Sequence, residues 1–370
     1  MNDQAATGTF FLPGPTQVRP AVLAAMQQPM IAHRGARFEE LFDRLQHGMR
    51  DMFRTGRPVF VGACSGTGMM EAAVRGARPG RVLSLVNGSF SERFARIARA
   101  CGREVDVLEA RPGATVQLDT VSEALGRRRY SALTVVHSET SSGALTDVRS
   151  VGALAREHGV LSLVDSVSGI GGAALECDAW GLDLVLTASQ KALALPAGLA
   201  FAVASEVYMA HVASAPSRGI YLDLEMFADA ARHDQTPFTP ALSLLFALER
   251  QLADIAAEGV TARWARHEAM ANVTWKWAEG LADAIHPALG LLAPVGGRSP
   301  TVSAITLPAT LSSDALVDAV GDRGFVVGTG NGATRDSTFR IGHMGDHTVP
   351  GLERCLEACS DALSELIRLR

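Results

Sequence analysis

Apolar runs that alternate with helical segments constrain the fold of this chain more than any other feature. Runs of β-branched residues and leucine occupy residues 59–61, 82–86, 132–136, 160–164 and 184–186. Amphipathic spacing between them predicts helices over residues 67–75, 91–101 and 148–158. Strands without polar alternation are typical of a sheet buried on both faces. We therefore predict an α/β fold with a mostly parallel central sheet between layers of helices.

Segments outside this alternation predict the remaining organisation. Residues 1–20 are rich in proline and glycine and are expected to form an extended arm. Helical spacing covers residues 20–54 and a long tract at 240–281, after which the pattern is that of a smaller α+β domain. We accordingly expect an arm, a large domain over 21–258 and a small C-terminal domain over 259–370.

Composition excludes several classes of protein. The chain has 370 residues, of which 47% are hydrophobic and 20% charged, so it can bury a sizeable core. Its net charge of -5 argues against nucleic acid or an anionic membrane as a partner. It lacks an apolar run of membrane-spanning length and a signal peptide, so we expect a cytoplasmic protein. Its five cysteines form no metal-type cluster, and no metal is expected.

Conspicuous polar side chains follow the predicted strands. They are Ser65, Asn87, Thr140, Asp165 and Lys191. In an open α/β sheet, ligands bind outside the carboxyl ends of the strands. We therefore expect a single active site at this edge of the sheet.

Lysine is scarce in this chain, because only Lys191 and Lys276 occur among its 34 lysine and arginine residues. Lys191 directly follows a predicted strand. A buried amine can be deprotonated whereas a guanidinium cannot, which makes Lys191 a candidate for a covalent imine. The alternative is an ordinary surface lysine at a strand end. Lys276 lies in a helical pattern with charges spread along it, and we expect it at the surface.

The glycine-rich segment at residues 62–68 has two interpretations. Its glycines would let a phosphate approach the free N–H groups of the next helix, although no P-loop or dinucleotide motif is present. The segment also fits a nucleophile elbow, with Cys64 as the nucleophile and His343 or His347 as the base. This hydrolase interpretation leaves Lys191 without a function.

Three further residues are candidates for binding. Asp165 ends a buried strand, where a carboxylate is costly unless it caps a helix, ligates a metal or holds a protonated ring nitrogen. It has no neighbouring metal-type ligands. Phe90 fits the core or a stack on a flat ring. Arg340 suits a substrate carboxylate, since its guanidinium can bind both oxygens.

Together these segments resemble the class V aminotransferases of pyridoxal-phosphate fold type I, in particular the alanine–glyoxylate and serine–pyruvate (serine–glyoxylate) group. The resemblance covers nearly the whole chain and rests on the order and spacing of residues 12–16, 33–34, 65–68, 87–90, 139–143, 164–169, 189–193, 236–240 and 340–345. It implies an enzyme that moves an amino group from alanine or serine to glyoxylate or pyruvate.

The resemblance also implies a role for each site residue. Lys191 would form an aldimine with the cofactor, pyridoxal 5′-phosphate, and Asp165 would hold its ring nitrogen. Further contacts to the same cofactor would come from Ser65, Gly66, Thr67, Phe90, Thr140, Val167 and Gln190. His233 and Thr236 would reach the cofactor of the other subunit in a homodimer. Gly14 and Arg340 would contact the substrate.

Two departures from the family pattern leave alternatives open. His233 stands where the family often has tyrosine, and residues 35–37 also differ. An aminophosphonate or pyridoxamine donor, a lyase reaction and a non-catalytic regulatory or assembly protein remain alternatives. A cysteine desulfurase would need a mobile cysteine in residues 328–335, and this segment has none.

Overall fold

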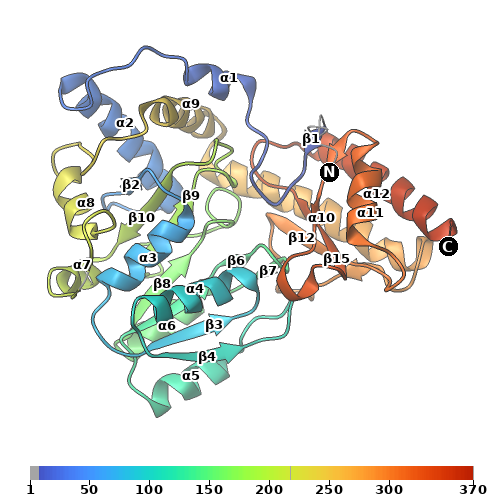
Figure 1. The fold of residues 1–370 in the computed structure, drawn as a ribbon, viewed down its shortest axis with the longest axis horizontal. Helices are drawn as coiled ribbons and strands as arrows, with labels where there is room; N and C mark the ends of the chain where they lie inside the picture. The colour runs from blue at the N-terminus through green and yellow to red at the C-terminus, as the bar shows by residue number, and fades with distance from the viewer. Residues whose placement is uncertain (1–7, 217, 370) are drawn as a thin grey trace.

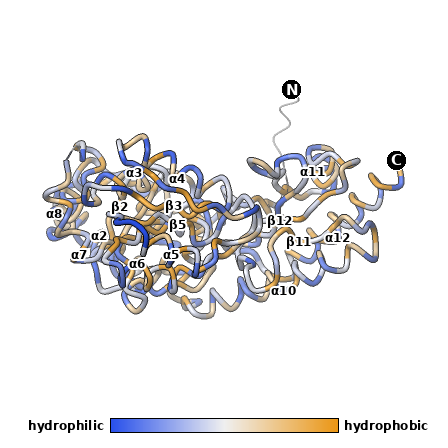
Figure 2. Tube along the Cα trace, turned by 90° about the horizontal axis from the view of Figure 1, so that it is seen from below, coloured by the Kyte–Doolittle hydropathy of each residue, from blue (hydrophilic) through white to orange (hydrophobic). Residues whose placement is uncertain are grey.

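The computed structural model describes residues 8–216 and 218–369, so the start of the predicted arm lies outside the described residues. The chain forms a larger and a smaller body that lie end to end (Figures 1 and 2). Apolar segments gather inside both bodies (Figure 2). Within the described residues, no helix is long and apolar enough to cross a membrane.

A seven-stranded sheet lies at the centre of the larger body, in the order β2-β10-β9-β8-β5-β3-β4. Its strands are β2 (Phe60–Gly62), β3 (Val82–Val86), β4 (Val105–Glu109), β5 (Ala132–Val136), β8 (Leu161–Asp165), β9 (Leu184–Ala188) and β10 (Ala200–Ala204). The strands from β9 to β4 pair in parallel, and β10 pairs antiparallel with β9 and β2. This arrangement confirms the predicted mostly parallel sheet.

Helices cover both faces of this sheet (Figure 1). One face shares a hydrophobic core with α2 (Ala36–Phe53), α5 (Leu118–Arg127), α6 (Val148–Glu157) and α9 (Leu242–Glu258). The other face packs against α3 (Gly66–Gly76), α4 (Ser89–Ala100), α7 (Glu206–Val212) and α8 (Leu224–Ala231). In β9, Val185 faces the first core whereas Leu184 and Leu186 face the second. Burial on both faces explains why this strand has a continuous apolar run.

The smaller body is built on an antiparallel sheet in the order β11-β12-β15-β14. These strands are β11 (Gly290–Leu291), β12 (Val302–Thr306), β14 (Gly328–Thr329) and β15 (Thr338–Gly342). One hydrophobic cluster joins the sheet to α10 (Val260–Ala284), α11 (Ser313–Gly321) and α12 (Val349–Arg368). The short elements β6 (Ser138–Glu139), β7 (Ala144–Leu145) and η1 (Gly332–Thr334) lie in connecting segments.

The N-terminal arm is more ordered than the sequence indicates. Its strand β1 (Thr9–Phe10) pairs in parallel with β13 (Phe325–Val326) of the smaller body. The proline and glycine content of residues 1–20 predicted an extended arm but gave no sign of this strand. Backbone pairing explains the difference, because the N–H of Phe11 also donates to the carbonyl of Val326 at 2.8 Å.

Both long helical tracts predicted from the sequence are split. The first consists of α1 (Pro20–Ala25) and α2, with an irregular segment between them. The second is broken at Gly259, whose φ of 85° lies in the left-handed region that favours glycine. After this break, α10 packs against β11, β12 and α12. The domain boundary at residue 258 stays a prediction, and the break in the helix supports it.

Candidate active site

Lys191 lies in the turn that follows β9, at the carboxyl end of the parallel strands. Its carbonyl accepts hydrogen bonds from the N–H of Ala194 at 2.8 Å and from Thr16 Oγ1 at 3.0 Å, which fix the turn. The side chain is only 7% exposed, and Nζ donates to the carbonyl of Pro13. Burial, together with the positive charge of Arg340, lowers the pKa of Lys191 to about 8. The amine is therefore easier to deprotonate than an ordinary lysine, and about a tenth of it is uncharged at pH 7.

Asp165 is the last residue of β8 and is 2% exposed. Its Oδ1 accepts a hydrogen bond from the N–H of Val167 at 2.7 Å. Burial nevertheless raises the pKa of Asp165 to about 7, against the lowering effects of this N–H and of Lys191. Among the described residues, no ion pair involves Asp165. A protonated ring nitrogen would supply the missing cation, so this carboxyl fits pyridoxal phosphate.

The start of α3 fits the phosphate group. Ser65 is the N-cap residue but makes no side-chain capping hydrogen bond, so the first N–H groups of the helix are available to a ligand. A Cβ atom on Gly66 would lie 2.7 Å from Val167, which shows how closely the two loops approach. Gln190 Oε1 is buried without a hydrogen-bond partner in the described structure. Because Oε1 accepts hydrogen bonds, it cannot pair with phosphate oxygens, and a contact from Gln190 to a bound phosphate would come from its Nε2 group.

Phe90 lies in the first turn of α4, and its ring centroid is 6.0 Å from Lys191 Nζ. The start of this helix is held by Glu139, which is fully buried. The carboxylate of Glu139 accepts from the N–H groups of Phe90 at 3.3 Å and Ser91 at 3.0 Å. Glu139 is not among the site residues predicted from the sequence. Glu139 is separated from Phe90 by 49 positions and from Ser91 by 48, so no local sequence pattern reveals this capping contact.

Thr140 and Arg340 meet where the two bodies approach each other. Arg340, in β15, donates to the carbonyl of Thr140 at 3.2 Å and to that of Thr329 at 2.8 Å. Burial lowers the pKa of Arg340 to about 10, and the negative charge of Glu139 opposes this shift. Thr140 Oγ1 lies 2.5 Å from Ser168 Oγ. The structure thus brings the predicted carboxylate-binding arginine beside a predicted cofactor contact.

Gly14 closes the site from the N-terminal arm. Its φ is 106°, and a Cβ atom at this position would lie 2.5 Å from Lys191 Nζ. Glycine is therefore required here both by the backbone conformation and by the close approach of the lysine.

His233 and Thr236 do not join this group within one chain. His233 is exposed after α8, whereas Thr236 is buried and donates to the carbonyl of Phe238 at 2.8 Å. Among the described contacts, none links either residue to Lys191 or its neighbours. Their predicted contact with the cofactor of another subunit stays a prediction.

The hydrolase interpretation finds no support in the geometry. Burial raises the pKa of the Cys64 thiol to about 11, which disfavours a thiolate. The His343 ring nitrogens lie 3.0 Å from Ser303 Oγ and 3.0 Å from the carbonyl of Pro300, while His347 stacks on Phe11. Both imidazoles therefore have other partners. In the described part of the chain, no group of three or more His, Cys, Asp or Glu could hold a metal ion.

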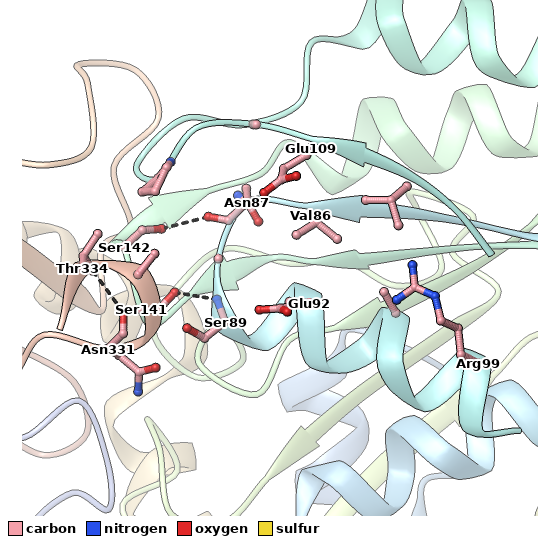
Figure 3. Close-up of a pocket in the computed structure, with 16 residues that line it drawn as sticks. Val86, Asn87, Ser89, Glu92, Arg99, Glu109, Ser141, Ser142, Asn331 and Thr334 are labelled. Atoms are coloured by element: carbon pink, nitrogen blue, oxygen red, sulfur yellow. Dashed lines mark hydrogen bonds between the residues drawn. The ribbon is translucent and has the colours of Figure 1, made fainter.

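A cavity of about 410 Å³ adjoins this group of residues (Figure 3). It lies between the start of α4 and residues Asn331 and Thr334 of the smaller body. Ser89 and Ser141 line it, and the Ser89 N–H donates to Ser141 Oγ at 3.0 Å. Neither Lys191 nor Asp165 lines this cavity, so the chemistry implied by these two residues lies outside it.

Known proteins with related sequences and structures share this architecture. The family model for class V aminotransferases matches residues 9–272. An uncharacterized aminotransferase from Methanocaldococcus jannaschii is 33% identical over 93% of this chain and 90% of that protein. A serine–glyoxylate aminotransferase from Methylorubrum extorquens is 30% identical over 91% of this chain and 86% of that protein.

A solved structure extends the similarity to the fold. The alanine–glyoxylate aminotransferase from a Nostoc species has a TM-score of 0.90 and 28% identity, covering 98% of this chain and 97% of that one. The matched family region includes Lys191, Asp165 and the start of α3. This chain therefore belongs to the class V aminotransferase family, whose members are pyridoxal-phosphate-dependent enzymes.

Proposed function

We propose that this enzyme transfers an amino group from a small L-amino acid, alanine or serine, to glyoxylate or pyruvate. The observation that carries the proposal is the burial of Lys191 at the carboxyl end of the strands, within electrostatic range of Asp165 and Arg340. The names of the similar proteins from Methylorubrum extorquens and Nostoc support glyoxylate as an acceptor, and serine and alanine as donors.

The proposed residue roles follow from the position and charge of each side chain. Bound pyridoxal phosphate supplies the electron sink that stabilises negative charge at the substrate α-carbon. Lys191 Nζ, uncharged in part near neutral pH, takes up the α-proton and returns it. Asp165 keeps the ring nitrogen protonated because a buried carboxylate is stabilised by an adjacent cation. Arg340 binds the substrate carboxylate with its guanidinium.

Orientation and substrate size involve other parts of the chain. Phe90 and Val167 are proposed to pack on the two faces of the ring, and Thr140 to hydrogen-bond near the 3-oxygen of the ring. The Pro13 carbonyl lies against Lys191 Nζ, and Gly14 packs on the same side chain. This close cover leaves little room for a large substrate side chain, which supports small donors.

We further propose that the enzyme acts as a homodimer with shared active sites. His233 and Thr236 would contact the cofactor of the other subunit, in keeping with their separation from Lys191 in one chain. Ile220 and Tyr221, near the Thr236 segment, are 67% and 46% exposed, and such apolar residues suit an interface. All five cysteines are free thiols, which supports a cytoplasmic location.

A spectroscopic titration tests the reaction. The purified protein is loaded with pyridoxal phosphate, and its visible absorption is followed as L-serine, L-alanine or L-aspartate is added. We expect serine or alanine to bleach the visible band and glyoxylate to restore it, because the two half-reactions run in opposite directions. A band that responds to neither small donor, but does respond to aspartate, pyridoxamine or an aminophosphonate, would overturn the substrate assignment.

Lys191→Ala provides the matched test of the residue role. Without the amine, we expect turnover to be abolished even though the protein remains folded. Lys276→Ala, which removes the only other lysine of the chain, should keep normal turnover. Normal activity in Lys191→Ala would contradict the proposed chemistry.

A further inference from the structure

We infer that Arg93 is a further cofactor-binding residue, whose guanidinium contacts the phosphate group of bound pyridoxal phosphate. This inference deepens the proposed function and rests on its placement of the phosphate at Ser65, Gly66 and Thr67. Arg93 is one of many arginines in a chain with few lysines, so its residue type alone does not single it out.

The position of Arg93 connects two parts of the proposed cofactor site. Arg93 lies one helical turn after Phe90 in α4, so both side chains are on the same side of the helix. Its guanidinium carbon is 4.8 Å from the centroid of the Phe90 ring. Its Nη1 lies 3.5 Å from Thr67 Oγ1, at the start of α3. The guanidinium is therefore held between the residue that stacks on the ring and the residues that bind the phosphate.

The charge of Arg93 is available to a ligand. The side chain is exposed, and no ion pair joins it to a carboxylate within residues 8–216 and 218–369. Burial sets the main pKa shifts of Asp165 and Lys191, but the positive charge of Arg93 also lowers the pKa of both groups. Arg93 is therefore close enough to Asp165 and Lys191 for its charge to act on both side chains.

Among the described residues, none of the other side chains proposed to contact the phosphate carries a positive charge. The proposed contacts at Ser65, Gly66, Thr67 and Gln190 are N–H groups, hydroxyls and an amide, all of them neutral. A phosphate monoester carries about 1.5 to 2 negative charges at neutral pH, and charge-assisted hydrogen bonds to arginine are roughly twice as strong as neutral ones. A guanidinium beside Thr67 supplies the complementary charge.

The same helix offers a matched control. Arg96 lies in α4 three residues after Arg93 and is likewise exposed. No described hydrogen bond or ring contact links Arg96 to Thr67 or Phe90. Replacing Arg96 removes one positive charge from α4 without touching the proposed phosphate contact.

Comparison of pyridoxal phosphate with pyridoxal, which lacks the phosphate, tests the inference. Apoprotein is titrated with each compound, and binding is followed by absorption or fluorescence for the wild-type protein, Arg93→Gln and Arg96→Gln. We expect Arg93→Gln to weaken pyridoxal phosphate binding by about 10- to 100-fold, the range for losing a hydrogen bond to a charged group. Its affinity for pyridoxal, and both affinities of Arg96→Gln, should change by less than about twofold, since surface substitutions away from a contact have small effects.

Equal weakening of both compounds, or no weakening of either, would overturn the role of Arg93 in phosphate binding. If the wild-type protein binds the two compounds equally, the phosphate placement of the proposed function itself fails, which separates the two failures. Should Arg93→Gln not fold, Arg93→Lys provides the same comparison, because lysine keeps the charge but loses the planar fork. A selective loss of pyridoxal phosphate affinity then supports the inference, and an equal change in both affinities contradicts it.

Discussion

At the scale of single residues, the chemistry of this enzyme depends on what burial does to charged groups. The side chains of Lys191 and Asp165 are both nearly inaccessible, and burial shifts their pKa values toward the neutral range from opposite sides. The amine becomes easier to deprotonate and the carboxyl harder to ionise. A bound cofactor with a protonated ring nitrogen restores the charge of Asp165.

The lowered pKa of Lys191 predicts a pH dependence for cofactor uptake. At a pH below its pKa of about 8, the amine is mostly an ammonium ion, which has no free electron pair. The rate at which apoprotein takes up pyridoxal phosphate should therefore rise with pH through this value and level off above it. Stopped-flow absorption at a series of pH values measures the profile.

Arg340 gives an internal check on this profile. After burial, its positive charge is the next cause of the lowered pKa of Lys191. Arg340→Gln should therefore raise that pKa and move the rise to higher pH. A profile that does not move would exclude this electrostatic coupling.

Gly14 predicts an effect of a single methyl group. Gly14→Ala places a Cβ atom 2.5 Å from Lys191 Nζ, so the arm or the lysine must shift. We expect a loss of about 1–3 kcal/mol in the free energy of unfolding, the range for overpacking a closed site, together with weaker cofactor binding. Urea denaturation and cofactor titration measure the two effects.

Gly102→Ala serves as the control for Gly14→Ala, because it separates the cost of backbone strain from the cost of the contact with Lys191. Gly102 also has a positive φ, 77°, but open space where a Cβ would lie. The Gly102→Ala variant should lose only the free energy of unfolding that the strained backbone costs, and it should bind the cofactor normally. Equal cofactor binding by both variants would contradict the contact between Gly14 and Lys191.

Some of the site residues could be predicted from the sequence, and others could not. The scarcity of lysine singled out Lys191, and its position after an apolar strand placed it at the correct edge of the sheet. Arg93 was hidden because arginine is abundant here, and Glu139 because its partners lie far away in sequence. Both depend on tertiary contacts that local patterns do not encode.

At the scale of secondary-structure elements, a buried ion-pair network joins segments that surround the site. Arg263 of α10 is 2% exposed. It donates to Glu258 at 2.8 Å, to Asp346 at 2.9 Å and to the carbonyl of Ala192 at 2.7 Å. Asp346 also accepts from Arg19 of the arm at 2.6 Å. The network thus ties the arm, α10 and the loop of Asp346 to the turn that carries Lys191.

This network predicts a large loss of stability when Arg263 is removed. Arg263→Ala removes the most buried member of the network, while Asp346 keeps Arg19 and Glu258 keeps Arg266, so we expect a cost somewhat below the roughly 3–5 kcal/mol of a fully uncompensated buried charge. Arg127→Ala serves as the control, because its pair with Glu123 is exposed and should contribute far less. Urea denaturation of the apoproteins gives the free energies of unfolding. Similar values for the two variants would show that the network has no special role in stability.

Elements were predicted well where burial made their sequence distinctive. The continuous apolar strands β3, β5, β8 and β9 lie where the runs indicated. The edge strand β4 was missed because its residues are partly exposed and mixed with acids, and β10 because it is rich in alanine. Helix α10 continues the apolar spacing of α9, so the break at Gly259 was visible only as one glycine in a long tract.

At the scale of the whole molecule, the proposed site draws on both bodies of one chain. Arg340 in β15 reaches Thr140 of the larger body, and the arm brings Gly14 to Lys191. Changes in how the two bodies approach each other would therefore alter the substrate pocket. The order of the motifs along the sequence indicated this convergence, but only the fold shows which side chains touch.

Shared active sites predict complementation between two inactive variants. Lys191→Ala lacks the catalytic amine, and a His233→Ala/Thr236→Ala variant lacks the proposed contacts across the dimer. In a mixed dimer, one site receives Lys191 from one chain and His233 and Thr236 from the other, so it is intact. Unfolding and refolding an equal mixture should restore about a quarter of wild-type activity, since half of the randomly formed dimers carry one intact site of two. If both groups act within one chain, the mixture stays as inactive as its parents, and the proposal of a shared site fails.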